Sequence, residues 1–433
     1  MTTRQRALLT EASVSRETKE VTGKVLFAGI DWASTEHAVA VNDDAGRALA
    51  SFTVEHSAEG FDKLVARLRA FGEPGGLTVA IERPDGRLVD RLLEAGHPVV
   101  AVSPNAIKAW REGEVVSGAK SDPGDAAVIA EYLRLRFHLL EPLQPFSDHT
   151  RALRAAVRAR GDLVAQRTAA HNQLEATLDA FWPGAKEVFS DVTCKIALAF
   201  LRRYPTPASA AKLGEKQMAA FCRKHGYSGG RSAADLVERL RRAPAGITAV
   251  AETAARKAAV LAYVGVIASL NAAIKDLDKE VATALGEHPD GEIFTSLPRS
   301  GLINAAQMLA EWGDCRQAYD APEAVAALAG MSPVTKRSGK YKAVHFRWAC
   351  NKRFRTAVHT FADNSRHGSD WAAGIYAQAR ARGADHPHAV RILARAWIRV
   401  IYRCWSDGVG YDPAKHKAAV ALAARDKPAS QAA

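Results

Sequence analysis

The sequence is poor in cysteine, with only 5 in 433 residues. No two of them form a Cys-x-x-Cys pair, and their number is odd. This excludes a disulfide-stabilised scaffold and makes a zinc ribbon a poor fit. Such cysteine usage fits a reducing compartment. We therefore expect a cytoplasmic protein.

Long apolar runs are missing as well. Residues 1–23 carry seven charged side chains around no apolar core, so we do not expect a signal peptide. The longest uncharged stretch, Ala258–Ile274, has 17 residues and contains Ser269 and Asn271. It is too short and too polar to predict a membrane span, so we expect a soluble protein without a membrane partner.

Charge is unevenly balanced, with 59 Lys and Arg against 47 Asp and Glu, a formal net charge of +12. An excess of positive charge on a soluble chain favours a polyanionic partner, because counterion release drives contact with phosphates. The remaining composition, 48% hydrophobic and 24% charged, is that of globular proteins and excludes wholesale disorder. The length allows two or three domains.

Residues 24–147 are predicted to form an α/β domain. Continuous apolar runs over residues 24–30 and 77–81 are typical of central strands, and they end on Asp31 and Glu82. The predicted order is β-β-β-α-β-α-β-α. Three leading strands with short connections, followed by αβ crossovers, indicate a mixed sheet and not a doubly wound parallel one.

The rest of the chain is predicted to be helical. Two apolar heptad stripes within residues 148–286 predict an antiparallel coiled-coil arm, whose simplest role is spacing or dimerisation. His171 lies on the first stripe and is expected at the helix seam. Residues 287–412 predict a further helical domain, and the terminal segments 1–23 and 413–433 are expected to be disordered.

Acidic residues in three segments suggest a metal site. Besides Asp31 and Glu82, the segment after Lys120 places Asp122 at a predicted helix N-cap and Asp125 three residues on, on the same face. Phosphodiester chemistry with two metal ions needs several converging carboxylates. Each acid also has a structural interpretation: Asp31 could cap a turn, Asp122 could cap its helix, and Glu82 could pair with Arg83 or Arg87.

Two basic segments favour nucleic-acid binding. Residues 336–355 contain eight Lys and Arg and no acid, interleaved with aromatic residues, and arginines recur at four-residue spacing from Arg391 to Arg403. Residues 292–314 predict a helix, a tight Pro/Gly turn and a second helix, whose N-terminus could bind phosphate, although an ordinary αα-hairpin fits equally well. The residues that we expect to contact nucleic acid are Arg299, Gly301, Lys336, Arg337, Lys340, Lys342, Arg347, Lys352, Arg353, Arg355, Arg391, Arg395 and Arg399.

Ser338 lies in the first basic segment beside Lys336, Arg337 and Lys340. A serine that attacks phosphorus needs positive charge around the developing phosphorane, and these cations could provide it. On the residues alone, a serine before a glycine is also an ordinary turn residue.

These motifs together resemble the DEDD transposases of the insertion-sequence one-ten family. The resemblance covers about residues 25–412, in order and in spacing. It rests on the sequences Gly-Ile-Asp31-Trp-Ala-Ser, Ala-Ile-Glu82-Arg-Pro-Asp-Gly, Lys-Ser-Asp122-Pro-Gly-Asp125-Ala, Leu-Pro-Arg299-Ser-Gly301, Leu-Ala-Glu311-Trp-Gly-Asp314, Ala-Gly-Met-Ser332-Pro-Val and Arg-Ser338-Gly-Lys.

The resemblance implies a RuvC-like domain with an RNase H fold, in which Asp31, Glu82, Asp122 and Asp125 hold Mg²⁺ or Mn²⁺. It also implies a C-terminal transposase domain whose Ser338 forms a covalent link to DNA. The implied partners are double-stranded DNA of the element ends and the target, a structured bridge RNA as guide, and further copies of the chain in a homodimer or tetramer.

The sequence departs from the family pattern at Arg299, where many relatives have glycine in the hairpin turn. Ser332 is a second candidate nucleophile, but it lacks neighbouring cations. Other functions remain open on the sequence: a RuvC-like Holliday-junction resolvase or metal-dependent nuclease that needs no serine, or a catalytically inactive nucleic-acid-binding protein. A DEDD exonuclease fits less well, because it needs glutamate where Ala33 stands.

Overall fold

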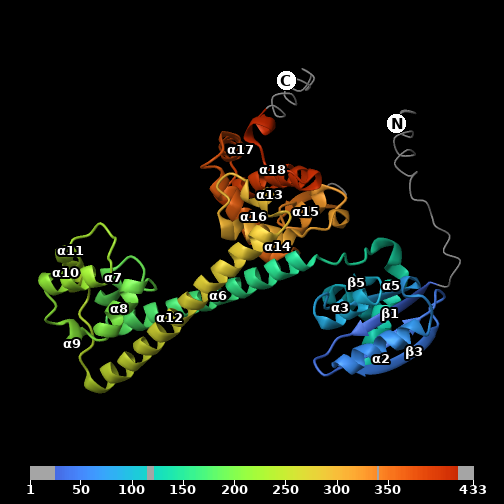
Figure 1. Cartoon of the computed structure of the whole chain (residues 1–433), viewed down its shortest axis with the longest axis horizontal. Helices are drawn as coiled ribbons and strands as arrows, with labels where there is room; N and C mark the ends of the chain where they lie inside the picture. The colour runs from blue at the N-terminus through green and yellow to red at the C-terminus, as the bar shows by residue number, and fades with distance from the viewer. Residues whose placement is uncertain (1–24, 115–120, 339–340, 418–433) are drawn as a thin grey trace. The chain divides into compact units, whose positions relative to one another are not determined.

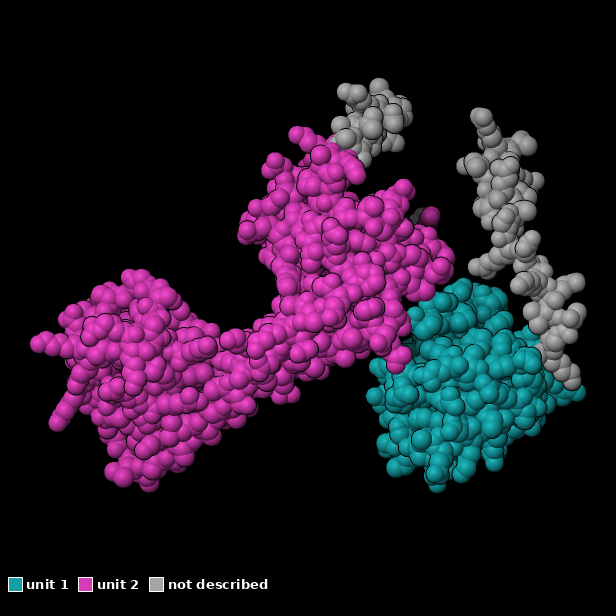
Figure 2. All heavy atoms as spheres, in the orientation of Figure 1, with its two compact units in different colours: residues 1–145 teal, residues 146–433 magenta. Residues whose placement is uncertain are grey.

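The structure is a computed structural model that describes residues 25–114, 121–338 and 341–417. The chain divides into two compact units, one ending at Pro145 and one beginning at Phe146 (Figure 2), and each is described by itself. The expectations for residues 1–23, for most of the tail, for Lys340 and for the side chain of Lys342 fall outside the described residues.

The first unit is built on a five-stranded mixed sheet with the strand order β3-β2-β1-β4-β5, so the predicted mixed sheet is confirmed. β1 pairs antiparallel with β2 and parallel with β4; β2 pairs antiparallel with β3, and β4 pairs parallel with β5. The strands are β1 (Leu26–Asp31), β2 (Glu36–Asn42), β3 (Ala48–Glu55), β4 (Leu77–Ile81) and β5 (Val99–Ala101).

Helices cover both faces of this sheet. Alternate strand residues such as Ala28, Ile30 and Val79 pack in one core with apolar residues of α2 (Ala58–Arg69) and α3 (Arg87–Glu94). The intervening residues pack against the other layer, which contains α4 (Pro104–Glu114) and α5 (Asp122–Arg136). Successive side chains of a strand point to opposite faces, and helices cover both faces. Every residue of a central strand is therefore buried, which explains the unbroken apolar runs in the sequence.

The second unit contains an arm of two long helices, α6 (Asp148–Phe181) and α12 (Val250–Glu287), which lie side by side (Figure 1). Leu153 near the start of α6 shares a core with Leu285 near the end of α12, and Leu174 shares another with Val260. The helices are therefore antiparallel, as predicted. His171 is half-buried on α6 and lies 3.5 Å from Glu175.

Smaller elements gather at the two ends of the arm (Figure 1). One end carries α7 (Gly184–Val188), α8 (Lys195–Arg203), α9 (Pro207–Ala210), α10 (Glu215–Lys224) and α11 (Ala233–Arg242). The other end carries α13 (Gly291–Thr295), α14 (Leu302–Trp312), α15 (Pro322–Leu328), the strands β6 (Val334–Ser338) and β7 (Tyr341–His345), α16 (Lys352–Ser365), α17 (Asp370–Ala381) and α18 (His386–Asp407).

The structure corrects two expectations. Within the domain that was predicted to be helical, the segment from Val334 to His345 is an antiparallel hairpin, β6–β7. Its Val334, Thr335, Tyr341 and Val344 favour extended backbone. The N-cap of α5 is Ser121 and not Asp122: the Ser121 Oγ accepts a hydrogen bond from the Gly124 N–H at 3.3 Å.

Helix α12 contains the uncharged stretch that was judged too short and too polar for a membrane span, but the helix extends well beyond that stretch. Its 38 residues form the one described helix that is long and apolar enough, by length and composition, to cross a membrane. Core helices of other proteins pass the same test. Only 22% of its most apolar 18-residue window is buried, and Leu261 and Val266 are exposed. The arm therefore leaves an apolar strip uncovered in the single chain.

A buried carboxylate joins the arm to the C-terminal helices. Glu311 of α14 is 4% exposed and accepts two hydrogen bonds from the Arg158 guanidinium of α6, at 2.9 and 3.0 Å, and one from the Asn351 amide at 2.7 Å. Burial alone would raise the pKa of Glu311, but these bonds and the charge of Arg154 lower it below its usual value. Asn351 in turn caps α16 through Phe354 N–H.

Replacing Glu311 by glutamine should lower the free energy of unfolding of the second unit by about 3 kcal/mol, because two arginines lose their buried partner. Chemical denaturation of the full chain measures this. Glu323→Gln is the matched control, since Glu323 meets Arg399 on the exposed surface. Equal unfolding midpoints for the two variants would contradict the assigned role of Glu311.

Candidate active site

The structure brings Asp31 and Glu82 to the same edge of the sheet. β1 and β4 are parallel neighbours, and Ile30 pairs with Ile81, so the residues that follow are neighbours too. Ile30 and Ile81 face the core of α2 and α3, whereas Phe27 and Ala80 face α5. The alternation of side chains along β1 therefore places Asp31 on the face covered by α5, and Glu82 directly follows the neighbouring end of β4.

Helix α5 runs antiparallel to β1 across that face. Near its start, Ala126 and Ala130 pack on Ala38, the β2 residue that pairs with Asp31. Near its end, Leu133 shares a core with Phe27 at the opposite end of β1. The first turn of α5, which carries Asp122 and Asp125, thus lies at the carboxyl ends of β1 and β4.

Gly29 makes this close approach possible. A Cβ at this position would lie 2.2 Å from the Ala126 carbonyl oxygen and 2.3 Å from the Ala130 nitrogen, which leaves no room for a side chain between β1 and α5. Two backbones would have to separate to admit one methyl group, and the spacing of the acids would change with them.

Gly29→Ala should therefore lower the free energy of unfolding of the first unit by about 3 kcal/mol through overpacking. The thermal midpoint of that unit in calorimetry of the full chain measures it. Gly75→Ala is the control, because a Cβ at Gly75 meets no atom within 4 Å. If the two variants melt alike, β1 and α5 do not depend on this contact.

The four acids do not have the same surroundings. Asp122 is exposed, while Asp125 is half-buried and forms an ion pair with Arg111 of α4. Asp31 and Glu82 are each partly buried. In the described part of the chain, no three Asp, Glu, His or Cys side chains form a group that could hold a metal ion. Strand pairing and the direction of α5 bring the backbone positions of the four acids to one end of the sheet, but their side chains do not converge on a common point.

Residues that the sequence analysis missed brace the loops after β1 and β4. The Arg83 guanidinium lies 4.4 Å from the Trp32 ring centre, which joins the residues directly after Glu82 and Asp31. Ala33 N–H donates to the Nδ1 atom of His37 at 3.2 Å, and the His37 Nε2 atom lies 2.8 Å from the His56 Nδ1 atom. Because Nδ1 of His37 accepts, its proton is on Nε2, and the ring is neutral.

Burial, with the neighbouring His56 as a second cause, lowers the pKa of His37 to about 4. As the pH falls below about 6.5, the unfolded chain takes up this proton before the folded chain does. We therefore expect the free energy of unfolding to decrease between pH 6.5 and pH 4. In His37→Gln, thermal melts over this range should show a smaller decrease, and an unchanged pH dependence would contradict the assignment.

Ser338 belongs to the second unit, where it is the last residue of β6 and pairs with Tyr341 of β7. It is exposed, as are Lys336 and Arg337 on the same strand. Ser332, the second candidate, is half-buried, and its carbonyl oxygen accepts a hydrogen bond from the Arg347 Nε atom at 3.0 Å. The structure thus leaves Ser338 the more accessible hydroxyl.

The predicted turn between two helices is present, with α13 before it and α14 after it. Arg299 has a φ of 61°, the one positive φ outside glycine among the described residues. The position thus adopts the left-handed backbone that glycine takes without strain, and arginine adopts it at a cost of about 1 kcal/mol. Its side-chain stem lies against Gly368. Gly301 is exposed and caps α14.

Several predicted DNA-contacting side chains have protein partners. Arg353 donates to the Arg158 carbonyl oxygen and to Asp162 on the arm, at 3.3 and 2.8 Å. Arg355 donates to the Arg347 carbonyl oxygen and lies 4.5 Å from the Phe346 ring centre. These contacts give both arginines a structural role in the single chain, whereas Lys352 is exposed at the start of α16.

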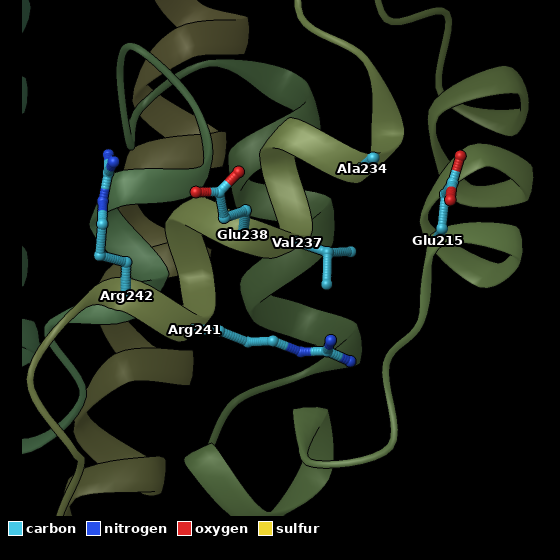
Figure 3. A pocket seen from close by; sticks show the side chains of 6 residues that line it. All are labelled: Glu215, Ala234, Val237, Glu238, Arg241 and Arg242. Carbon is cyan, nitrogen blue, oxygen red and sulfur yellow. The ribbon is translucent and has the colours of Figure 1, made fainter.

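A pocket between α10 and α11 is lined by side chains of both charges, unlike the basic segments described above (Figure 3). It encloses about 450 Å³ and is lined by Glu215 and Glu238 together with Arg241 and Arg242. Its mixture of charges does not favour a polyanion.

Comparison with known proteins identifies the family. A model of DEDD transposases of IS110 elements, described as "Transposase", matches residues 28–183, and one described as "Transposase IS116/IS110/IS902 family" matches residues 291–377. The chain is 33% identical over 388 residues to the "Mini-circle putative transposase for IS117" of Streptomyces coelicolor, covering 88% of this chain and 93% of that protein. The chain belongs to the IS110 family of transposases.

Two further relatives of this IS110-family transposase span most of its length. The "Insertion element IS900 uncharacterized 42 kDa protein" of Mycobacterium paratuberculosis is 29% identical over 91% of the chain and 99% of the relative. The "Insertion element IS110 uncharacterized 43.6 kDa protein" of Streptomyces coelicolor is 28% identical over 84% and 88%. Membership implies that the transposase binds DNA, acts on an insertion sequence by phosphoryl transfer, and has a metal-dependent acidic site.

Proposed function

We propose that this transposase excises and inserts its insertion sequence by strand exchange through a serine–DNA intermediate. One observation carries the proposal: the chain has acidic residues at one edge of a mixed sheet, and it also has an exposed serine among cations on a hairpin. We further propose that the first unit is an RNase H-like, RuvC-like domain, for which the strand order and the helices on both faces are the support.

The acid positions fit a divalent cation. Carboxylate oxygens are the ligands that Mg²⁺ and Mn²⁺ prefer, and Asp31, Glu82, Asp122 and Asp125 would supply them. When bound, the ions supply charge stabilisation at the attacking and leaving oxygens. In the structure Arg111 balances the charge of Asp125, so metal binding at Asp125 requires this ion pair to open.

The reaction assigned to Ser338 is a transesterification, in which one P–O bond forms as another breaks. Its Oγ atom loses a proton and attacks the phosphorus, the P–O bond to one strand breaks, and the leaving oxygen takes a proton. Lys336 and Arg337 stabilise the charge that develops on the phosphorane. The hydroxyl of another strand then attacks the phosphoserine, which restores the serine and joins the new strands without loss of bond energy.

The partners implied by the family resemblance are part of this proposal. A structured bridge RNA would pair with the element ends and the target, and co-purified RNA that maps next to the reading frame would support it. A homodimer or tetramer would cover the apolar strip of the arm at Leu261 and Val266. A monomer in sedimentation at micromolar concentration, with and without nucleic acid, would contradict this assembly.

The test of the function uses the full chain with labelled DNA that carries the element ends, the RNA transcribed from the flanking region, and Mg²⁺. We expect joined product and a protein–DNA adduct that survives denaturation, and neither when EDTA is present. Cleaved DNA without adduct or joined product would instead identify a metal-dependent nuclease or junction resolvase. DNA binding without cleavage or joining would identify an inactive DNA-binding protein.

A further inference from the structure

A groove of about 580 Å³ lies between the end of the serine hairpin and helix α18. Residues 344–347, which end β7 and follow it, line one side. His388, Arg391, Arg395 and Arg399 of α18 line the other. Of the described residues that line the groove, none is acidic. Arg403 continues the four-residue spacing on α18 but does not line the groove.

The arginines of the groove are held mainly by aromatic and backbone groups, so most of their positive charge is not neutralised. Arg391 lies 5.0 Å from the Phe346 ring centre, and Arg347 donates to a backbone carbonyl. The Arg395 Nε atom is buried without a hydrogen-bond partner among the described residues. The nearby acid is Glu323, which forms an exposed ion pair with Arg399 and whose pKa the charge of Arg395 also lowers. The buried Arg395 Nε–H group, which has no acceptor among the described residues, indicates that the groove binds an anion.

An exposed aromatic ring stands beside the groove. Trp348 is 76% exposed, and its ring meets the Phe346 ring edge-on at 4.9 Å. Phe346 already contacts the guanidinium groups of Arg355 and Arg391, so Trp348 offers the accessible face. Proteins that bind single strands combine a cationic groove that follows the backbone with aromatic rings on which bases stack.

We propose that this groove binds an unpaired DNA strand, with its phosphates on Arg391 and Arg395 and one base stacked on Trp348. The inference rests on the proposed function and specifies that the groove binds DNA in its unpaired form. Ser338 lies at the turn end of the same hairpin, and the groove lies at its open end, so a strand that reaches both would run along the hairpin.

The size of the groove favours an unpaired strand over a duplex. Its volume lies in the range of about 300–1,000 Å³ that is typical of sites for small molecules. It therefore admits a nucleotide but not a double helix. A base can stack on Trp348 only after it has left its own duplex stack, and strand exchange supplies such bases. The strand is DNA because the serine of this hairpin acts on DNA.

The experiment measures fluorescence anisotropy of a labelled 12-nucleotide DNA with the full chain, against the same sequence as duplex DNA and as single-stranded RNA. Trp348→Ala should weaken single-stranded DNA binding about tenfold and duplex binding less than twofold. Arg395→Gln should weaken it by a similar factor and lower the slope of log K against log salt by about 0.7, the value for one phosphate of a single strand.

Matched controls come from the same elements. Arg403→Gln removes an exposed arginine of α18 that pairs with Asp407 outside the groove, and Tyr341→Ala removes an exposed ring of the hairpin. Both should leave single-stranded binding within twofold of the parent chain. Thermal melts show that each variant is folded, and Arg395→Lys should recover part of the affinity that Arg395→Gln loses.

Three results would overturn the proposal: unchanged binding in Trp348→Ala and Arg395→Gln, equal losses for duplex and single strand, or a larger loss for RNA than for DNA. The adduct assay separates this proposal from the function. If an adduct forms while the groove variants bind normally, only the groove assignment fails. If no adduct forms while Trp348 and Arg395 control single-strand binding, only the serine chemistry fails.

Discussion

Ser338→Ala is expected to abolish the covalent protein–DNA adduct and to reduce strand joining by about 10⁵-fold or more, as removal of a catalytic nucleophile does. The substitution removes one oxygen from an exposed position at the end of β6, so folding and DNA affinity should be unchanged. Gel electrophoresis under denaturing conditions with end-labelled DNA measures the adduct directly, and the labelled end that stays with the protein shows which strand is attached.

Ser332→Ala is the matched control for this experiment. Ser332 lies in the same region but is half-buried, without neighbouring cations in sequence. It should retain both adduct and product. An adduct that persists in Ser338→Ala and vanishes in Ser332→Ala would transfer the nucleophile to Ser332. If it persists in both, serine chemistry on this hairpin is refuted.

Asp31→Asn and Glu82→Gln are each expected to reduce strand cleavage about 10³-fold, since a metal-bound transition state owes several kcal/mol to its carboxylate-held ions. The amides keep the shape of the side chains and remove their charge. Isothermal titration with Mg²⁺ gives a second measurement that needs no DNA, and we expect the binding heat of the parent chain to be lost in both variants.

Glu59→Gln provides the control, because Glu59 lies in the first turn of α2, on the other face of the sheet. It should leave cleavage and metal binding unchanged. Normal Mg²⁺ binding in both Asp31→Asn and Glu82→Gln would show that the acids at this edge do not hold the ion, even if cleavage is lost.

The sheet and the arm could be predicted from the sequence because their signals are local. Apolar runs ending on Asp31 and Glu82 specified buried strands, and the two stripes of the arm recur with helical spacing. The pairing of Ile30 with Ile81 is a property of the folded sheet. The sequence suggested it only through the order of the elements.

Other features depended on contacts between distant residues and could not be predicted. Glu311 meets Arg158 across 153 positions, and Arg83 meets Trp32 across two different strand ends. The arginines of residues 336–355 looked equivalent in sequence, but Arg353 and Arg355 are held by protein partners. The β6–β7 hairpin was missed because a dense run of cations obscured its alternation.

The bond network of Glu311 has a mechanical consequence. At 1.5 Å per residue, the 38 residues of α12 span about 57 Å. Glu311 joins α14 to α6 at the end of the arm that carries β6 and β7, so a displacement of α7–α11 at the far end would act on this end through a long lever (Figure 1). A partner that displaces these distal helices would then also displace the serine hairpin, which would couple assembly to the position of the nucleophile.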